Sequence, residues 1–333
     1  MKIQYRIKNG AVEVVRCFGT GETIILPEEI EGKIVRSVAP YTFSAKKRSE
    51  DTDVLEYRTE DDFLEEDMET ILAGEKIWEV VFPETVQEIG NYLFYGCREL
   101  RKVTCSDRLE RIGSGAFTGC GKLRELEVSL IVGEKSCIKE ILGDLWQRID
   151  VTFYRKNIEA DSEEEKTEVV KLVFPEHYEE AVENTPARIL FTQHHGIGNN
   201  YRQCFYDRKL DYQKYDELFG LAKAQEAAEV LEDLVFWRMQ YPYQLSERAR
   251  KGYEMWLLEH LKPVAEHLAE TEQIDRLSCI GQWNLWKKEV LDEVIVCAAE
   301  QEKAEITGFL MNERQKFFPE VKETRKKKRR FEL

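Results

Sequence analysis

Apolar and polar positions repeat with a period of 23 residues in the first half of the chain. Residues 78–100 align with residues 101–123, and their apolar positions coincide. The matched positions are Val80 with Val103, Phe82 with Cys105, Val86 with Leu109, Ile89-Gly90 with Ile112-Gly113, Phe94 with Phe117, Cys97 with Cys120 and Leu100 with Leu123. Apolar residues at a spacing of two predict a short strand, and repetition of the whole segment predicts one turn of a solenoid.

Two weaker copies extend this array. Residues 24–43 carry an earlier copy, in which Leu26-Pro27 stands where Phe82-Pro83 does. A fading copy begins at residue 124 and keeps Leu126 and Val128 in register, after which the pattern dissolves. About four stacked turns would pair their short strands into a parallel sheet and bury a continuous apolar column.

The same alternation predicts which side chains of these strands face outward. If Ile77, Val80 and Phe82 point into the solenoid, the residues between them point away from it. The resulting candidate for a concave recognition face consists of Glu79, Val81, Lys102, Thr104, Glu125 and Glu127. The alternative for each of these residues is a solvated strand position with no ligand.

The second half of the chain has helical periodicity from residue 215 onward. Helices are predicted over residues 215–239, 247–269, 272–281, 288–301 and 303–318, with a bend or break near Pro263. The predicted fold class is therefore α+β, a short solenoid followed by an α-helical domain. A short array gains too little from burial to offset its backbone entropy, so we expect the second half to dock on it.

Acidic and polar stretches indicate where domains divide. Residues 50–69 contain eleven Asp or Glu against one Arg, and residues 156–168 have the composition of a linker. Residues 169–191 predict a strand, a Pro-ended turn, a short helix and a second strand. The predicted organisation is a repeat domain at 1–155 with an acidic insertion at 46–76, a linker at 156–168, an α/β bridge at 169–214, a helical domain at 215–320 and a basic tail at 321–333.

The phrase IGxxxFxGCxxL after a strand and a proline resembles the BspA-type leucine-rich repeat, and residues 1–43 resemble the opening hairpin and first turn of that family. This resemblance extends over the first part of the chain, to about residue 140. It implies a protein-recognition scaffold and no particular reaction. The last two predicted helices, at 288–301 and 303–318, weakly resemble a degenerate ankyrin-like helical pair, without the TPLH turn of that family.

Charge is unevenly distributed along the 333 residues, whose formal net charge is −15. The tail at 321–333 holds seven Lys or Arg against two Glu, a local +5 that leaves −20 for the rest. Its densest part is Lys326, Lys327, Lys328, Arg329 and Arg330. Nucleic-acid binding is therefore expected only through the tail, because the remainder repels phosphate.

Candidate chemistry is sparse. His194-His195 could ligate a metal and Gly196 and Gly198 could approach a phosphate, but a hydrogen-bonded turn is the simpler interpretation. Cys204 beside these histidines is a weak candidate nucleophile, and His260 and His267 are expected to be ordinary helix-surface residues. We therefore predict no catalytic residue, no metal site and no cofactor.

Eight cysteines without a CxxC pair, and no apolar stretch that could span a membrane, indicate a reduced, cytoplasmic protein without membrane segments. The resemblance to the BspA-type repeat implies a bacterial protein, and the oligomeric state is left open. The leading functional hypothesis is a non-catalytic adaptor that binds a protein partner through the repeat face and the helical domain. The alternative is association with nucleic acid or the ribosome through the basic tail. A third hypothesis is that the tail contacts the acidic insertion.

Overall fold

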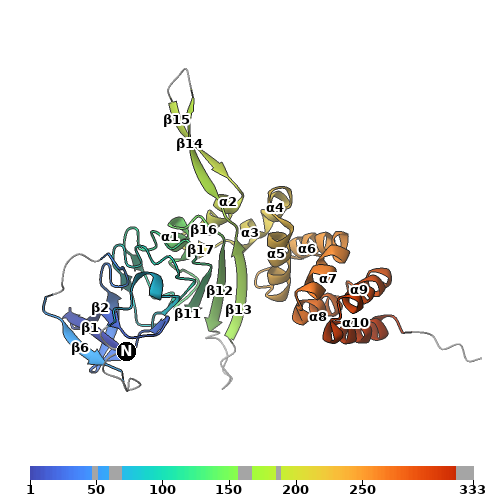
Figure 1. Ribbon diagram of the computed structural model, residues 1–333. Helices are drawn as coiled ribbons and strands as arrows, with labels where there is room; N and C mark the ends of the chain where they lie inside the picture. Colours follow the sequence, from blue (N-terminus) through green and yellow to red (C-terminus); the bar gives the residue numbers. More distant parts are fainter. Residues whose placement is uncertain (47–51, 60–69, 157–166, 185–188, 320–333) are drawn as a thin grey trace, which may run out of the picture. The chain divides into compact units, whose positions relative to one another are not determined.

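The computed structural model describes residues 1–46, 52–59, 70–156, 167–184 and 189–319 of the chain. The chain forms two compact units, residues 1–246 and residues 247–333 (Figure 1). The first unit contains a β-solenoid and the second is helical, which confirms the predicted α+β class.

The first sheet of unit 1 contains the predicted repeat strands. Its order is β13-β12-β11-β9-β7-β3, and every neighbouring pair except β12 and β13 is parallel. The strands are β3 (Thr23–Ile25), β7 (Glu79–Val81), β9 (Lys102–Ser106), β11 (Glu125–Leu130), β12 (Ile149–Lys156) and β13 (Thr167–Phe174). The parallel array thus continues to β12, one turn beyond the point at which the sequence pattern dissolves.

The second sheet forms from the amino-terminal hairpin and from short strands of the later turns. Its order is β10-β8-β5-β2-β1-β6, with β4 paired to β5. The strands are β1 (Lys2–Lys8), β2 (Ala11–Phe18), β4 (Glu29–Ile30), β5 (Lys33–Val38), β6 (Leu55–Arg58), β8 (Glu88–Ile89) and β10 (Arg111–Ile112). β6 belongs to the predicted acidic insertion and pairs with β1, while residues 47–51 and 60–69 of that insertion lie outside the described residues.

An aromatic column runs through the solenoid interior between turns. Phe94 stacks between Phe43 and Phe117, with ring centroids 5.3 Å apart on each side. All three rings are essentially inaccessible to solvent. The neighbouring Gly113 has to be glycine, because a Cβ there would lie 2.2 Å from the backbone nitrogen of Asn91. The 23-residue period of the sequence therefore arises because equivalent residues of successive turns stack on one another.

The carboxyl end of the array is closed by an antiparallel strand and helices. β13 pairs with β12, and α5 (Ala228–Gln240) packs against β13. The Tyr215 hydroxyl donates to the carbonyl of Val173 at 2.7 Å, and Arg148 forms an ion pair with Asp233 at 2.6 Å. Residues up to 246 thus pack on the array, whereas docking of residues 247–333 on it stays a prediction.

The remaining elements of unit 1 lie around this closed end. They are α1 (Ile138–Gly143), β14 (Tyr178–Asn184), β15 (Ile189–His195), α2 (Gly198–Arg202), β16 (Phe205–Tyr206), β17 (Lys209–Leu210), α3 (Tyr212–Glu217) and α4 (Phe219–Gln225). A 3₁₀ turn at Gly74–Lys76 lies instead beside the first turn, where the Gly74 N–H donates to the Phe43 carbonyl oxygen at 2.8 Å. The short helix predicted after Pro175 is wrong, because those residues form strand β14, which pairs with β15. The long helix predicted from residue 215 is divided into α3, α4 and α5.

Two buried arginines hold this end together. Arg202 donates to five backbone carbonyls, among them those of Leu142 at 3.2 Å and Gly198 at 3.0 Å. Arg238 makes a bidentate pair with Asp216 at 2.7 and 2.8 Å, and both residues are buried. Buried charges are tolerated only when hydrogen-bonded in this way.

The domain boundaries differ from those predicted. Residues 157–166 lie outside the described residues, but β12 and β13 on either side of them pair with each other in one sheet. The compact units instead divide after Ser246. The segment at 156–168, which has a linker-like composition, therefore connects two paired strands within one unit and does not divide two units.

Unit 2 is a small helical array. Its helices are α6 (Glu247–Glu259), α7 (Leu261–Glu270), α8 (Ile274–Gln282), α9 (Lys288–Glu300) and α10 (Ala304–Phe317). α7 packs on α9, and α8 packs on α10. The turns after α7 and α9 are alike, since Glu272 and Glu302 both have φ of 58°. α7 with α8 and α9 with α10 thus form two similar helical hairpins. Their ankyrin-like character stays a prediction.

Candidate protein-recognition face

The six residues predicted to face outward come together on one surface of the first sheet. Strand register places Glu79, Lys102 and Glu125 in one row across β7, β9 and β11. Val81, Thr104 and Glu127 form the neighbouring row, one pleat along. All six side chains are partly or fully exposed, so this surface, called the recognition face below, is open to solvent.

Lys102 links the two rows electrostatically. Its Nζ lies 3.3 Å from Glu79 Oε1 and 3.1 Å from Glu127 Oε1. Partial burial disfavours the charged amine, but hydrogen bonds and charges from Glu127 and Glu79 outweigh this effect and raise the pKa of Lys102. One cation is shared by two carboxylates, so the face retains surplus negative charge.

The two sides of the face differ, and one of them extends it beyond the predicted residues. Ile25 of β3 continues the row of Val81, and 63% of its surface is exposed. Glu125 is exposed at the opposite side and makes no ion pair within the described part of the chain. An exposed aliphatic edge therefore lies across the face from one carboxylate without an ion pair.

The carboxyl end of the face is closed by α5 and the segment after it. Lys171 of β13, in the row of Glu127, lies over the rings of Trp237 and Tyr241. Tyr154 of β12 donates its hydroxyl to Glu127 Oε1 at 3.4 Å. The open part of the face thus runs from β3 to β11. Sequence reasoning missed Ile25 and Tyr154 because their strands lie outside the two clear 23-residue copies.

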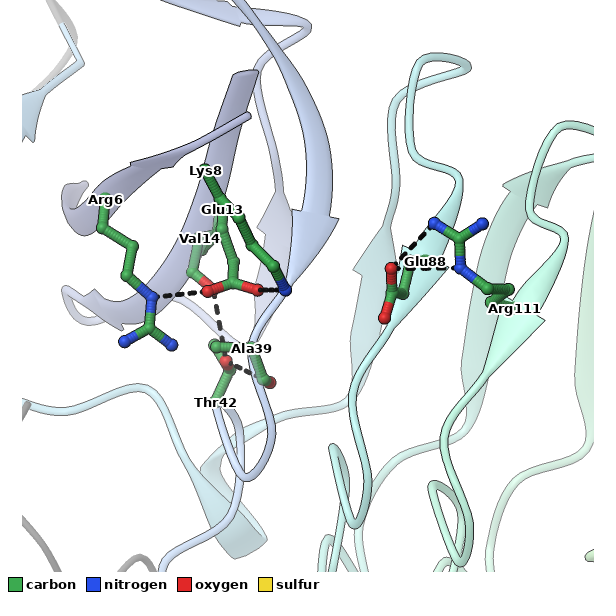
Figure 2. A network of polar contacts seen from close by, with 8 residues as sticks. All are labelled: Arg6, Lys8, Glu13, Val14, Ala39, Thr42, Glu88 and Arg111. Atoms are coloured by element: carbon green, nitrogen blue, oxygen red, sulfur yellow. Dashed lines mark hydrogen bonds and ion pairs between the residues drawn. The ribbon is translucent and has the colours of Figure 1, made fainter. Parts of the chain in front are cut away.

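The second sheet carries a different outward row, which the sequence did not reveal. Arg6, Glu13, Ser37, Glu88 and Arg111 stand side by side across β1, β2, β5, β8 and β10. Figure 2 shows Glu13 held between Arg6 and Lys8, and Arg111 reaching Glu88. We call this row the charge ladder.

Each carboxylate of the charge ladder is neutralised. Glu13 is 4% exposed and accepts from Lys8 Nζ at 2.9 Å and from Arg6 Nε. Burial raises the pKa of Glu13, but the hydrogen bonds from Lys8 and Arg6 outweigh it and leave the pKa below its ordinary value. A groove of about 490 Å³ runs beside the ladder and is bordered also by Glu140 and Arg208, which pair with each other.

The residues with candidate chemistry are dispersed. His195 ends strand β15, where it stacks on Tyr178 with ring centroids 4.4 Å apart and lies 3.2 Å from Glu180 Oε2. The predicted turn at His194-His195 is therefore wrong, and the His194 side chain is outside the described residues. Burial raises the pKa of Cys204 to about 12, which disfavours the thiolate needed of a nucleophile.

Other candidate residues have ordinary structural surroundings. The His260 ring stacks on Trp256, and its Nδ1 lies 2.8 Å from the Trp256 carbonyl oxygen. Within the described ranges, no group of three or more His, Cys, Asp or Glu could hold a metal ion. None of the helices described there has the length and apolarity to cross a membrane. The basic residues at 326–330 lie outside the described part of the chain.

A match to a protein-family model agrees with the solenoid. Residues 69–140 match the model of the BspA type leucine-rich repeat region, so this part of the chain is such a region. No curated protein matches the chain.

Three solved leucine-rich repeat proteins are similar to it. A leucine rich cell surface protein from Faecalibacterium prausnitzii is 20% identical with a TM-score of 0.26, over 40% of this chain and 29% of that protein. The T. pallidum leucine-rich repeat protein is 21% identical with a TM-score of 0.19, over 38% of this chain and 68% of that one. A Bacteroides ovatus protein is 15% identical with a TM-score of 0.20, over 40% and 49%.

Proposed function

We propose that this protein is a non-catalytic adaptor that binds a protein partner on its recognition face. Leucine-rich repeat proteins generally serve as protein-interaction scaffolds. The observation that carries the proposal is the open surface between β3 and β11, on which exposed Ile25 and partly exposed Val81 lie at one side and exposed Glu125, which makes no ion pair among the described residues, lies at the other. Such a surface suits a protein partner with aliphatic side chains at one side of its contact and basic side chains at the other.

The charge of the recognition face indicates what kind of partner it would bind. Glu79, Glu125 and Glu127 outnumber Lys102, and Lys102 is already shared between two of them. A Lys or Arg of the partner placed near Glu125 would therefore gain an attractive contact without displacing an existing one. An acidic partner would meet net repulsion over the same surface.

The test is affinity capture from an extract of the native host, using the full chain and a variant with Val81→Asp and Thr104→Asp. The charge-ladder variant Glu88→Gln/Arg111→Gln serves as the matched control. We expect a discrete protein to be retained by the full chain and by the control and lost by the face variant. Equal capture by all three proteins would contradict the assignment of the face.

A second candidate function is nucleic-acid or ribosome association through the basic tail. The local charge of +5 in residues 321–333 favours it. Binding of this kind falls steeply with salt because it depends on counterion release. A chain ending at Glu320 should then lose bound nucleic acid, and the full chain should release it at moderate salt. A partner kept by the shortened chain would instead favour the adaptor function.

We further propose a reducing, cytoplasmic location. The eight cysteines are free thiols, and six of them are buried. Thiols in this state persist most readily where glutathione and thioredoxin keep them reduced. Cell fractionation of the native host tests this directly, and recovery of the protein outside the cytoplasm would contradict it.

A further inference from the structure

The two helical hairpins of unit 2 are offset from each other by 30 residues. α7 ends at Glu270 and α9 ends at Glu300, and the turns that follow have the same positive φ at Glu272 and Glu302. Equivalent residues of the hairpins are therefore 30 positions apart in the sequence. Figure 1 shows α9 and α10 as the last labelled hairpin of unit 2, so no later hairpin among the described residues covers it.

Positions that are buried on the first hairpin are open on the second. Ala265 is fully buried in α7, which packs on α9, and a Cβ on Gly281 of α8 would lie 2.0 Å from Glu313 of α10. The equivalent residues of the second hairpin are Ile295, which is partly exposed, and Met311, which is 58% exposed. Helical repeat arrays cover such a face with a further repeat or with a cap.

A groove of about 460 Å³ lies on this open face of α9 and α10. Its lining includes Asp292, Ile295, Met311, Arg314, Phe318 and Pro319. Asp292 and Arg314 form an ion pair with each other, so the rest of these side chains give the groove an apolar character. Pro319 is the last described residue, and the chain therefore continues from the edge of the groove.

Unpaired carboxylates gather at the other end of the same hairpin. Over the described residues 288–319, the charged side chains that make no ion pair are Lys288, Glu289, Glu300, Glu302 and Glu305. The last three are exposed and lie in the turn between α9 and α10 or directly beside it. The whole length of α10 separates this turn from Pro319. The open face thus has an apolar groove at one end and negative charge at the other.

The segment after Pro319 matches both ends of this face. α10 has 14 residues, which corresponds to about 21 Å. An extended chain advances about 3.3 Å per residue, so a segment that runs back from Pro319 reaches the turn after about six residues, near Arg325. All six residues from Arg325 to Arg330 are Lys or Arg. Val321 falls at the apolar end and the basic run falls at the carboxylates.

We propose that residues 320–330 run back along the open face of α9 and α10 in an extended conformation. Val321 then occupies the groove, and the basic residues 325–330 pair with Glu300, Glu302 and Glu305. A second copy or another protein would have to reach this face from solution, whereas this segment is tethered at its edge and has a high effective concentration there. The ion pairs are exposed, so docking should be reversible and should weaken with salt. Docking would withhold the basic residues from nucleic acid, and it does not depend on the function of the recognition face.

The first test is carbodiimide cross-linking of the full chain at low ionic strength, with the joined residues identified by mass spectrometry. This reagent joins an amine to a carboxylate only where the two are in contact. We expect links from the lysines at 326–328 to the three glutamates of the α9–α10 turn, at a yield that falls with salt. Links to residues 50–69 in their place, or no preference for the turn, would overturn the proposal. A mixture of ¹⁵N-labelled and unlabelled protein distinguishes links within one chain from links between copies, and links found only between copies would also overturn it.

Trypsin cleavage after the basic residues at 325–330 gives a second measurement, because a docked segment is cleaved more slowly than a free one. We expect Glu300→Gln/Glu302→Gln to speed this cleavage about threefold or more at low salt, through loss of exposed ion pairs. Met311→Asp should also speed it, because a charge then enters the groove. The matched control Glu247→Gln/Glu259→Gln changes two exposed glutamates of α6 and should leave the rate unchanged. Equal rates in the wild type and all three variants would overturn the proposal and leave the face to another occupant.

Discussion

The two sheets of the repeat array differ in how their outward faces use charge. On the charge ladder, Glu13 is buried between two cations and Glu88 is paired with Arg111. On the recognition face, Lys102 is divided between two glutamates and Glu125 is left exposed. A saturated charged row stabilises the fold and offers little to a partner, whereas an unsaturated row beside exposed aliphatic groups remains available for binding.

The difference is confined to the outward faces, because both sheets share one interior. Phe94 follows β8 of the second sheet, stacks on Phe43 and Phe117, and lies 6.1 Å from the ring of Phe82, which follows β7 of the first sheet. Replacing it should destabilise both sheets together. We expect Phe94→Ala to cost about 3–5 kcal/mol, the usual range for a buried phenylalanine. Denaturant unfolding measures this cost, and amide exchange should show equal loss of protection in β8 and β9. Loss in one sheet alone would show that the sheets are independent.

The charge ladder should make a smaller contribution. Glu13→Gln removes a carboxylate that accepts hydrogen bonds from two cations in a buried position, and we expect a loss of about 1–3 kcal/mol. Glu88→Gln breaks a more exposed ion pair and should cost less than about 1 kcal/mol. Thermal or denaturant unfolding compares the two variants. Equal effects would mean that burial of Glu13 does not strengthen its ion pairs.

The contribution of Glu13 to the free energy of unfolding should also depend on pH. Its pKa is lowered in the folded protein, so its stabilising effect is present above its ordinary pKa and is lost as pH falls through the lowered value. Unfolding free energies of the wild type and of Glu13→Gln should therefore converge as pH falls below about 4.5. A constant difference across this range would show that the ionised carboxylate is not the source of the stability.

The recognition face should matter least for stability. Lys102 is partly exposed, and its two ion pairs lie at the surface. We expect Lys102→Met to change the unfolding free energy by less than about 1 kcal/mol and to do so mainly at low salt. Unfolding at two ionic strengths measures both features. A loss as large as that of Glu13→Gln would place Lys102 among the structural charges and weaken the contrast between the faces.

The sequence predicted the recognition face because its strands repeat. Glu79 and Lys102 occupy equivalent positions of two consecutive copies, and strict alternation assigns both to the outward side. The charge ladder could not be predicted in this way. The 23-residue period does relate Glu88 to Arg111, but β8 and β10 contain two residues each, too few to show the alternation that identifies an outward side. Their neighbours β5 and β2 come from parts of the sequence outside the two clear copies.

The region that closes the carboxyl end of the array was predicted less well for a related reason. Residues 178–184 are rich in glutamate and contain alanine, which favours a helix, yet pairing with β15 makes them a strand. Arg202 and Arg238 stabilise this region through tertiary contacts that no local pattern reveals. The acidic composition at 156–168 likewise suggested a boundary, although the flanking strands pair. Apolar periodicity therefore predicted the repeats. The region that closes the carboxyl end of the array depends on long-range polar contacts, which no local pattern predicts.

Site-specific photo-crosslinking in the native host tests most directly which surface binds a partner. A photoreactive phenylalanine analogue is placed at Thr104 on the recognition face or at Arg111 on the charge ladder, and covalent adducts are identified by mass spectrometry. We expect a discrete protein adduct from position 104 and none of comparable yield from position 111. An adduct formed from position 111 and absent from position 104 would contradict the central claim that the recognition face is the binding surface.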